Sequence, residues 1–119
     1  MSLFAAPSAA AMWRVGALSG ASSVLLGAFG AHALKARLGE GSPLLATWAT
    51  ASHYHLAHSG AILIAAGAKR PVPAALFAAG TLLFSGSLYA LVLSGYKALG
   101  AVTPVGGVLL TAGWLALLL

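Results

Sequence analysis

Three histidines stand close together in an otherwise apolar stretch, residues 51–60, which reads A-S-H-Y-H-L-A-H-S-G. On a helix, Tyr54 and His58 are four residues apart and His55 and His58 are three apart, so these three side chains share one face. His53 points elsewhere. Histidine is costly inside hydrocarbon unless it has a partner or a function. His55 and His58 are therefore the first pair of residues to consider as a functional site.

These residue types support only a few kinds of chemistry. A metal site built from His32, His55 and His58 is compatible with the spacing, as is haem ligation by His32 and His58, but no carboxylate is at hand to complete or orient such a site. A proton relay through His and Tyr is chemically reasonable. Ser59 beside His58 lacks an orienting acid for nucleophilic catalysis. We expect no enzyme activity, no catalytic residue, no metal and no cofactor.

The composition indicates the elements that position these residues. Of 119 residues, 61% are hydrophobic and 6% are charged, and the mean hydropathy is +0.98. These values are typical of an integral membrane protein. The six Lys and Arg are too scattered for a nucleic-acid interface. Transport coupled through a membrane carboxylate is excluded because the single acid, Glu40, lies in a predicted loop, and the absence of cysteine excludes disulfides.

The basic residues divide the chain into four apolar segments, each near the ~20 residues that a helix needs to cross a bilayer. None of them alternates with the period of two that a barrel strand shows. The predicted fold class is all-α, an antiparallel bundle of four transmembrane helices with both termini on the same side. An N-terminal tail at residues 1–11 precedes one domain at 12–119, and the predicted helices occupy about 12–34, 43–67, 72–94 and 101–119.

Small residues predict where the helices pack. In the first segment they recur at spacings of four and three and so form one stripe, which lets another backbone come close. His32 lies about 160° round the helix from this stripe at 100° per residue, so this segment needs contacts on both faces unless His32 reaches the interface. The predicted packing positions are Gly16, Gly20, Ser23, Gly27, Gly30, Gly86, Gly106 and Gly113.

Antiparallel threading collects most intramembrane polar side chains in one leaflet, at the end where the first segment connects to the second. An unpaired polar group in hydrocarbon costs several kcal/mol, so these side chains should bond to one another. Polar contacts that fix the helix register are one interpretation, and a functional cavity is the other. The predicted cluster comprises His32, Tyr54, His55, His58, Ser59, Ser85, Ser87, Tyr89 and Thr103.

Five motifs occur in order along the chain: G-A-F-G-A-H at 27–32, H-S at 58–59, L-F-S-G-S-L-Y at 83–89, T-P-V-G-G at 103–107 and A-G-W at 112–114. Together they resemble the transmembrane protein 256 family, a domain of unknown function (number 423), from about residue 13 to 119. The resemblance implies a small four-helix protein of bacterial or mitochondrial inner membranes, without an established activity. Its pattern omits His53 and His55 and includes His32, His58, Ser85, Tyr89, Thr103 and Pro104. On this pattern, His32 with His58 is the pair most worth testing.

Two functions are compatible with these features. The first is a non-enzymatic accessory or structural subunit of a larger inner-membrane, respiratory-type assembly, because the packing demand on the first segment exceeds what four short helices supply. Its partners would be the lipid bilayer and other membrane subunits or further copies of the chain, with no nucleic acid. The alternative is a small carrier or ligand-binding protein that uses a cavity around His32, Tyr54 and His58.

Overall fold

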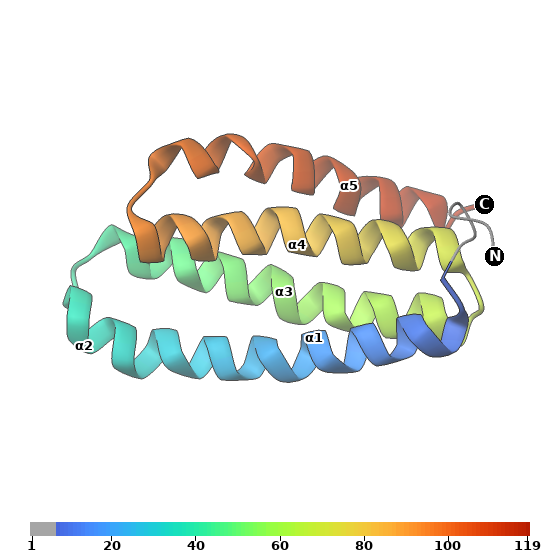
Figure 1. Cartoon of the computed structure of the whole chain (residues 1–119), viewed down its shortest axis with the longest axis horizontal. Coiled ribbons are helices and arrows are strands. Elements are labelled where there is room, and N and C mark those ends of the chain that lie inside the picture. The colour runs from blue at the N-terminus through green and yellow to red at the C-terminus, as the bar shows by residue number, and fades with distance from the viewer. Residues whose placement is uncertain (1–6) are drawn as a thin grey trace.

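The computed structural model describes residues 7–119, and these form an antiparallel bundle of long helices joined by short connections (Figure 1). The predicted all-α four-helix fold is confirmed. The first turn of the bundle's first helix and the last turn of its last helix lie at the same end (Figure 1). In chain order the elements are α1 (Ala9–Phe29), the π-helix η1 (Gly30–Leu34), α2 (Lys35–Leu38), α3 (Pro43–Gly67), α4 (Pro71–Ser94), the 3₁₀-helix η2 (Lys97–Ala101) and α5 (Thr103–Ala116).

The helix ends follow local capping chemistry. The Ser8 side chain accepts a hydrogen bond from the Ala11 backbone N–H at 3.1 Å, so α1 begins at Ala9. The sequence had predicted a later start, at about residue 12. Residues 1–6 of the predicted tail lie outside the described residues. Ser42 caps α3 in the same way, with Pro43 at the first helical position. At the end of α4, Gly95 takes a left-handed φ of 74°, which stops the helix.

Within residues 7–119, three helices are long and apolar enough to cross a membrane. They are Ala9–Leu38, in which α1, η1 and α2 are continuous, Pro71–Ser94, and Lys97–Ala116. The 25-residue α3 is not among them, although its length of about 37 Å would suffice, because its histidines and other polar residues make it less apolar. It lies between α1 and α4 along the bundle, so most of these polar groups face neighbouring helices. The most polar helix therefore has protein on two sides, as α4 also does.

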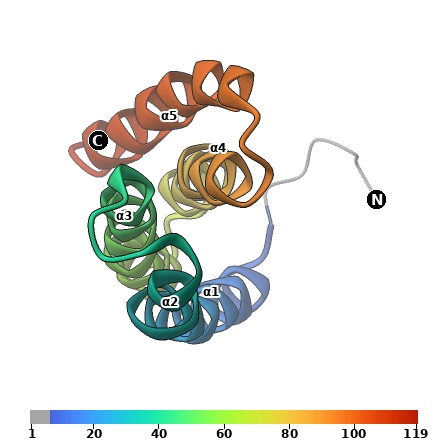
Figure 2. The same ribbon diagram turned by 90° about the vertical axis from the view of Figure 1, so that its left-hand side faces the viewer.

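The helices pack largely in chain order. The central α3 packs against α1 on one side and α4 on the other, and α5 packs on α4. An end-on view shows this curved row, in which α1 and α4 lie apart and α3 bridges them (Figure 2). One apolar core joins Ile62, Phe77 and Leu110, and a second surrounds Trp48. Because α1 contacts α4 only slightly, the space between these two helices is not closed by packing.

The small-residue stripe of α1 faces α3. A Cβ on Gly16 would lie 2.9 Å from Leu63, and one on Gly30 would overlap the Trp48 indole. On the same stripe, Ser23 is buried and Gly20 and Gly27 lie near serines of α3. This close approach is what drives helix association in lipid. The stripe is therefore occupied within the chain.

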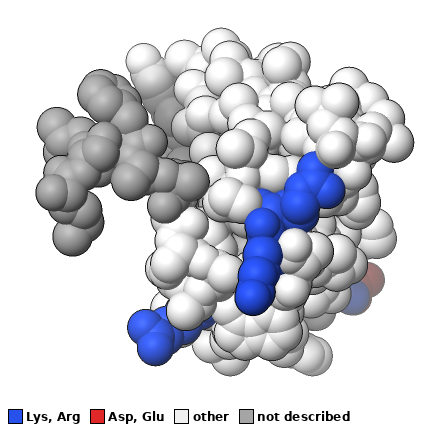
Figure 3. Space-filling model, turned by 90° about the vertical axis from the view of Figure 1, so that its right-hand side faces the viewer, with Lys and Arg blue, Asp and Glu red and all other residues white. Residues whose placement is uncertain are grey.

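Cations gather at the end of the bundle where α3 turns into α4 (Figure 3). Lys69 and Arg70 form this turn, and the Arg70 Nη2 donates a hydrogen bond to the carbonyl oxygen of Ala116 at 3.0 Å. A cation at a helix C-terminus satisfies a free carbonyl group and complements the helix dipole. At the opposite end, Lys35 pairs with Glu40 at 3.6 Å on the surface.

Candidate functional site

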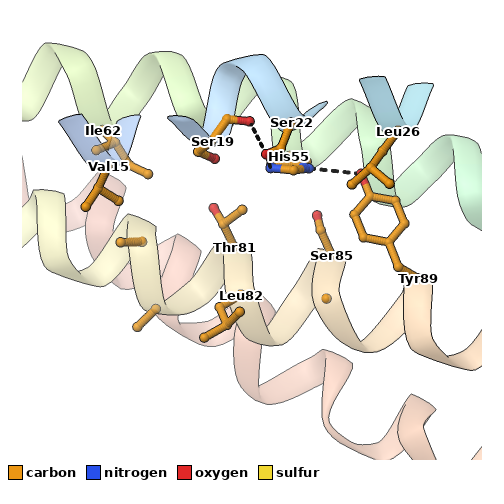
Figure 4. A pocket seen from close by; sticks show the side chains of 13 residues that line it. Val15, Ser19, Ser22, Leu26, His55, Ile62, Thr81, Leu82, Ser85 and Tyr89 are labelled. Carbon is orange, nitrogen blue, oxygen red and sulfur yellow. Dashed lines mark hydrogen bonds between the residues drawn. The ribbon is translucent and has the colours of Figure 1, made fainter. Parts of the chain in front are cut away.

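A groove runs between α1 and α4, with α3 as its floor, and has a volume of about 530 Å³. We call it the central groove. Its walls are mostly apolar, but polar side chains from all three helices reach into it (Figure 4). The lining residues are Val15, Ser19, Ser22, Leu26, His55, Ile62, Ala78, Ala79, Thr81, Leu82, Ser85, Gly86 and Tyr89.

The central groove lies at mid-depth. His55 is twelve residues from both Pro43 and Gly67, the ends of α3. At 1.5 Å per residue, its Cα lies about 18 Å along the axis from each end. In a bilayer whose hydrocarbon core of about 30 Å is centred on α3, His55 therefore lies near the midplane.

His55 joins the three helices that form the groove. Its Nδ1 lies 3.0 Å from the Tyr89 hydroxyl of α4, and its Nε2 lies 3.3 Å from the Ser22 hydroxyl of α1 (Figure 4). Ser22 has one hydroxyl proton, which it donates to the Ser19 carbonyl oxygen at 2.9 Å. Ser22 therefore accepts from the His55 Nε2–H, and the Tyr89 O–H donates to Nδ1.

The serines around this network are also satisfied. The Ser59 hydroxyl donates to the His55 carbonyl oxygen at 2.6 Å, so in its 2.6 Å contact with Ser19 it is the acceptor. Ser85 donates to the Ala51 carbonyl oxygen at 2.7 Å and so ties α4 to α3. Each of these hydroxyl protons thus has an acceptor within the protein.

Thr81 is the exception. Its side chain is only 7% exposed, and its Oγ1 has no hydrogen-bond partner among residues 7–119. The hydroxyl points across the groove toward the side where Ser19 and His55 lie (Figure 4). Burying a hydroxyl without a hydrogen-bond partner lowers the stability of a protein by roughly 1–3 kcal/mol, so a bound group that accepts from Thr81 would be stabilising.

A second polar region lies on the other side of α3, facing α5. The His58 Nδ1 lies 2.8 Å from the Tyr54 carbonyl oxygen, which can only accept, so Nδ1 carries the proton. Its Nε2 accepts from the Trp114 indole N–H at 3.0 Å. Phe77 packs against both rings. A hollow of about 630 Å³ borders this region between α3, α4 and α5.

The predicted polar residues fall into separate places. His55, Ser85 and Tyr89 line the central groove, and Ser59 lies beside it, bonded to the His55 carbonyl oxygen. His58 and Tyr54 face the second region, so the structure does not bring His55 and His58 together as one pair. His32 is exposed on η1 and His53 is exposed on α3. Within residues 7–119, no three His, Cys, Asp or Glu side chains are close enough to hold a metal ion.

Two further predicted polar residues join α4 to α5. The Ser87 and Thr103 hydroxyls lie 2.5 Å apart, and Ser87 also bonds the Phe84 carbonyl oxygen. Thr103 is the first residue of α5, and its side chain does not cap that helix. Its hydroxyl instead makes the hydrogen bond between α5 and Ser87 of α4.

Sequence reasoning missed several groove residues. Ser19 and Ser22 lie beside the glycine stripe of α1, and their spacing of three puts both on one face. Thr81 precedes Ser85 and Tyr89 by four and eight residues, so one face of α4 carries all three, a signal that was present. Gly86, predicted as a packing position, lines the groove instead: a Cβ there would meet nothing nearer than Leu82 of its own helix, at 3.8 Å.

The sequence predicted that the polar side chains gather in one leaflet, and in the structure they include residues at the middle of the bundle. Ser19, His55 and Thr81 lie near the middle of their helices, and Tyr89 and Thr103 lie toward the end where α4 leads into α5. The polar zone thus runs from the bundle's middle to one end.

Comparison with known proteins agrees with this architecture. Residues 26–107 match the family model described as "Protein of unknown function (DUF423)". A UPF0382 membrane protein of Staphylococcus aureus is 39% identical over 111 residues, which cover 88% of this chain and 89% of that protein. A UPF0382 membrane protein of Schizosaccharomyces pombe is 38% identical over 118 residues, covering 90% and 98%. No solved structure matches the chain.

These relatives are named membrane proteins in bacteria and yeast, and three helices here are suited to span a bilayer. The chain is an integral membrane protein, and it belongs to the DUF423 family.

Proposed function

We propose that this protein is a non-enzymatic membrane protein that binds a small molecule from within the bilayer in the central groove. The observation that carries the proposal is a groove of about 530 Å³ near the bundle's middle, with mostly apolar walls and a few polar side chains that reach into it. Its volume is in the range of small-molecule sites, which combine apolar walls with a few placed polar groups. This function corresponds to the carrier or ligand-binding alternative of the sequence analysis, with His55 in place of His32 and His58.

The hydrogen bonds of the groove do more than fix helix register. Contacts that serve register alone are normally made across closed interfaces, as between Ser87 and Thr103. Ser22, His55 and Tyr89 instead line an open space that side chains leave unfilled. The hollow beside His58 is also open, but only the groove contains a buried hydroxyl without a partner among residues 7–119, that of Thr81.

The groove does not favour catalysis. Glu40, the only acid in the sequence, is on the surface beside Lys35, and so cannot orient His55. The Ser59 proton is donated to a backbone carbonyl rather than to a histidine nitrogen. An activated nucleophile requires a base within hydrogen-bond reach. These contacts support binding without chemical conversion.

The test is to fill the groove. Gly86→Leu adds a side chain where a Cβ has room, while Gly60→Leu is the matched control on α3, where a Cβ would meet nothing within 4 Å. Both variants and the native protein are purified in mild detergent, and the co-purifying small molecules are measured by mass spectrometry. We expect at least one species with the native protein and with Gly60→Leu that is depleted by Gly86→Leu. Equal retention by all three proteins would refute the proposal.

A second candidate is the accessory or structural subunit of a larger inner-membrane, respiratory-type assembly, bacterial or mitochondrial. The observation that favours it is the outer face of α1, where Leu18 and Leu25 are exposed and where His32 is exposed on the continuing helix. A partner subunit or a second copy of the chain could cover this face. The glycine stripe no longer supports this candidate, because α3 occupies it.

Native gel electrophoresis of protein extracted in mild detergent tests the subunit role. Migration within a large assembly, with partner subunits identified by mass spectrometry, is the expected outcome of this second candidate. Migration as a monomer would exclude it and leave ligand binding in the central groove.

A further inference from the structure

We propose that the occupant of the central groove is an uncharged lipid with a carbonyl oxygen in its head group, and that Thr81 is the residue that selects it by donating a hydrogen bond. This inference rests on the proposed ligand-binding function and specifies the ligand class. Isoprenoid quinones and diacylglycerols both have this chemistry, and the experiment below distinguishes them.

The hydrogen-bond inventory of the groove specifies what the ligand must supply. Tyr89 donates to His55, His55 donates to Ser22, and Ser22 donates to a carbonyl oxygen. Ser85 likewise donates to the Ala51 carbonyl oxygen. Thr81 alone retains a buried hydroxyl without a partner among residues 7–119. A ligand that offers an acceptor therefore removes the one unsatisfied group in the groove.

The charge of the groove excludes ionic head groups. Among residues 7–119, no Lys, Arg, Asp or Glu lines it. Phosphate or carboxylate at this depth would require cationic partners, since an unpaired charge in a medium of low dielectric constant is strongly disfavoured. The ligand is therefore uncharged.

Depth separates this ligand from the bulk lipids of the bilayer. Phospholipid ester carbonyls are held near the headgroups, about 15 Å from the midplane in a core of about 30 Å. The acyl chains that do reach mid-depth have no hydrogen-bond acceptor. Thr81, eleventh of the 24 residues of α4, therefore needs a molecule whose polar group enters the hydrocarbon core. A lipid dissolved in the core meets this condition.

The shape of the groove suits a compact head with an apolar tail. Val15, Ile62 and Leu82 line the part toward the start of α1, while His55 and Tyr89 lie further along (Figure 4). A head group against Thr81 would have polar neighbours on one side and aliphatic walls on the other. The groove lies between α1 and α4, which contact each other only slightly, and this leaves a lateral path for the tail into the bilayer.

The experiment uses the full chain in detergent micelles with two probes, decylubiquinone and dioctanoylglycerol. Quinone binding is read from quenching of tryptophan fluorescence, because Trp48 packs on the groove residue Tyr89 with ring centroids 4.6 Å apart. Diacylglycerol binding is read from competition with the quinone. The infrared stretch of the bound carbonyl reports directly on its hydrogen bond.

Three variants isolate the hydroxyl. Thr81→Val removes it at nearly constant shape, and we expect about tenfold weaker binding, the loss of about one hydrogen bond. It should also abolish the infrared shift of the carbonyl. Thr81→Ser should restore both. The control Thr111→Val removes a hydroxyl that is already bonded to the Gly107 carbonyl oxygen, outside the groove, and should change neither.

The outcomes separate the two claims. Tighter binding of one probe identifies the head-group source as quinone or diacylglycerol. Unchanged affinity and infrared shift in Thr81→Val, or stronger competition by the anionic lipid phosphatidylglycerol than by either probe, would overturn the ligand class. Ligand binding itself would still stand if Gly86→Leu depletes a co-purified species, and it would fall only if that variant retains everything.

Discussion

Two histidines one turn apart on α3 have contrasting surroundings. The His58 ring lies between a carbonyl oxygen that can only accept and an indole N–H that can only donate, so a single tautomer fits. The His55 ring lies between two hydroxyls, those of Tyr89 and Ser22, which can each donate or accept. His58 is therefore held in one state, whereas His55 can exchange tautomers through hydroxyl rotations.

Packing follows the same division. Beyond His58, α4 and α5 approach so closely that a Cβ on Gly106 would overlap the Phe84 backbone, and one on Gly113 would lie 2.7 Å from Phe77. Around His55, α1 and α4 stay apart and Gly86 faces open space. Intramembrane polar residues in this protein thus have different surroundings: Ser87 and Thr103 join two closely packed helices, His58 borders the hollow beside α5, and His55 lines the central groove.

The motifs that carry the family resemblance contribute to both regions: Ser85, Gly86 and Tyr89 of L-F-S-G-S-L-Y line the central groove, and other motif residues make contacts with α5. His58 and Trp114 connect H-S with A-G-W. Ser87 and Thr103 connect L-F-S-G-S-L-Y with T-P-V-G-G. These contacts hold α3, α4 and α5 together, which gives this part of the pattern a structural reason that needs no chemistry.

The largest expected effect comes from a methyl group placed in each region. Gly106→Ala forces α5 away from backbone atoms that cannot yield, and should lower the free energy of unfolding by about 3 kcal/mol. Gly86→Ala adds the same methyl group beside the groove and should be neutral or slightly stabilising. Circular dichroism during SDS titration measures both. Equal losses would mean that the groove is as closely packed as the α4–α5 interface.

Removing each imidazole should have a smaller but still unequal effect. His58→Leu leaves the Trp114 indole N–H without its acceptor, and should cost about 1–2 kcal/mol of unfolding free energy. His55→Leu frees the Tyr89 hydroxyl at the edge of an open groove, where other partners can reach it, and should cost less than about 1 kcal/mol.

A double-mutant cycle checks that the His58 effect belongs to its indole contact. Trp114→Phe removes the donor, so His58→Leu should cost clearly less in that background than in the native protein. Additive losses would show that the two residues stabilise the bundle independently, and would remove the basis for treating His58 as locked.

The sequence predicted the fold well because its signals were local. Segment length, the glycine stripe, and Ser42 with Pro43 together specify helices and one packing face. The site was harder, because helical spacing places side chains on a face without saying which helix covers it. His55 and His58 are three residues apart, yet α1 and α4 surround one while α5 covers the other. Packing in chain order, which leaves α1 and α4 apart, could not be derived from the segments alone.

The smallest expected effect tests the two histidines most directly. In ¹⁵N NMR of histidine-labelled protein, His58 should carry its proton on Nδ1 and His55 should carry its proton mainly on Nε2, from the direction of their bonds. Tyr89→Phe removes the donor to the His55 Nδ1. The resonance of the His55 Nδ1 should then move toward that of a free acceptor nitrogen, while the His58 signals stay in place. The free energy of unfolding should fall by only about 0.6 kcal/mol. The same tautomer on both rings, or an equal response of both, would mean that the two surroundings do not control the rings differently.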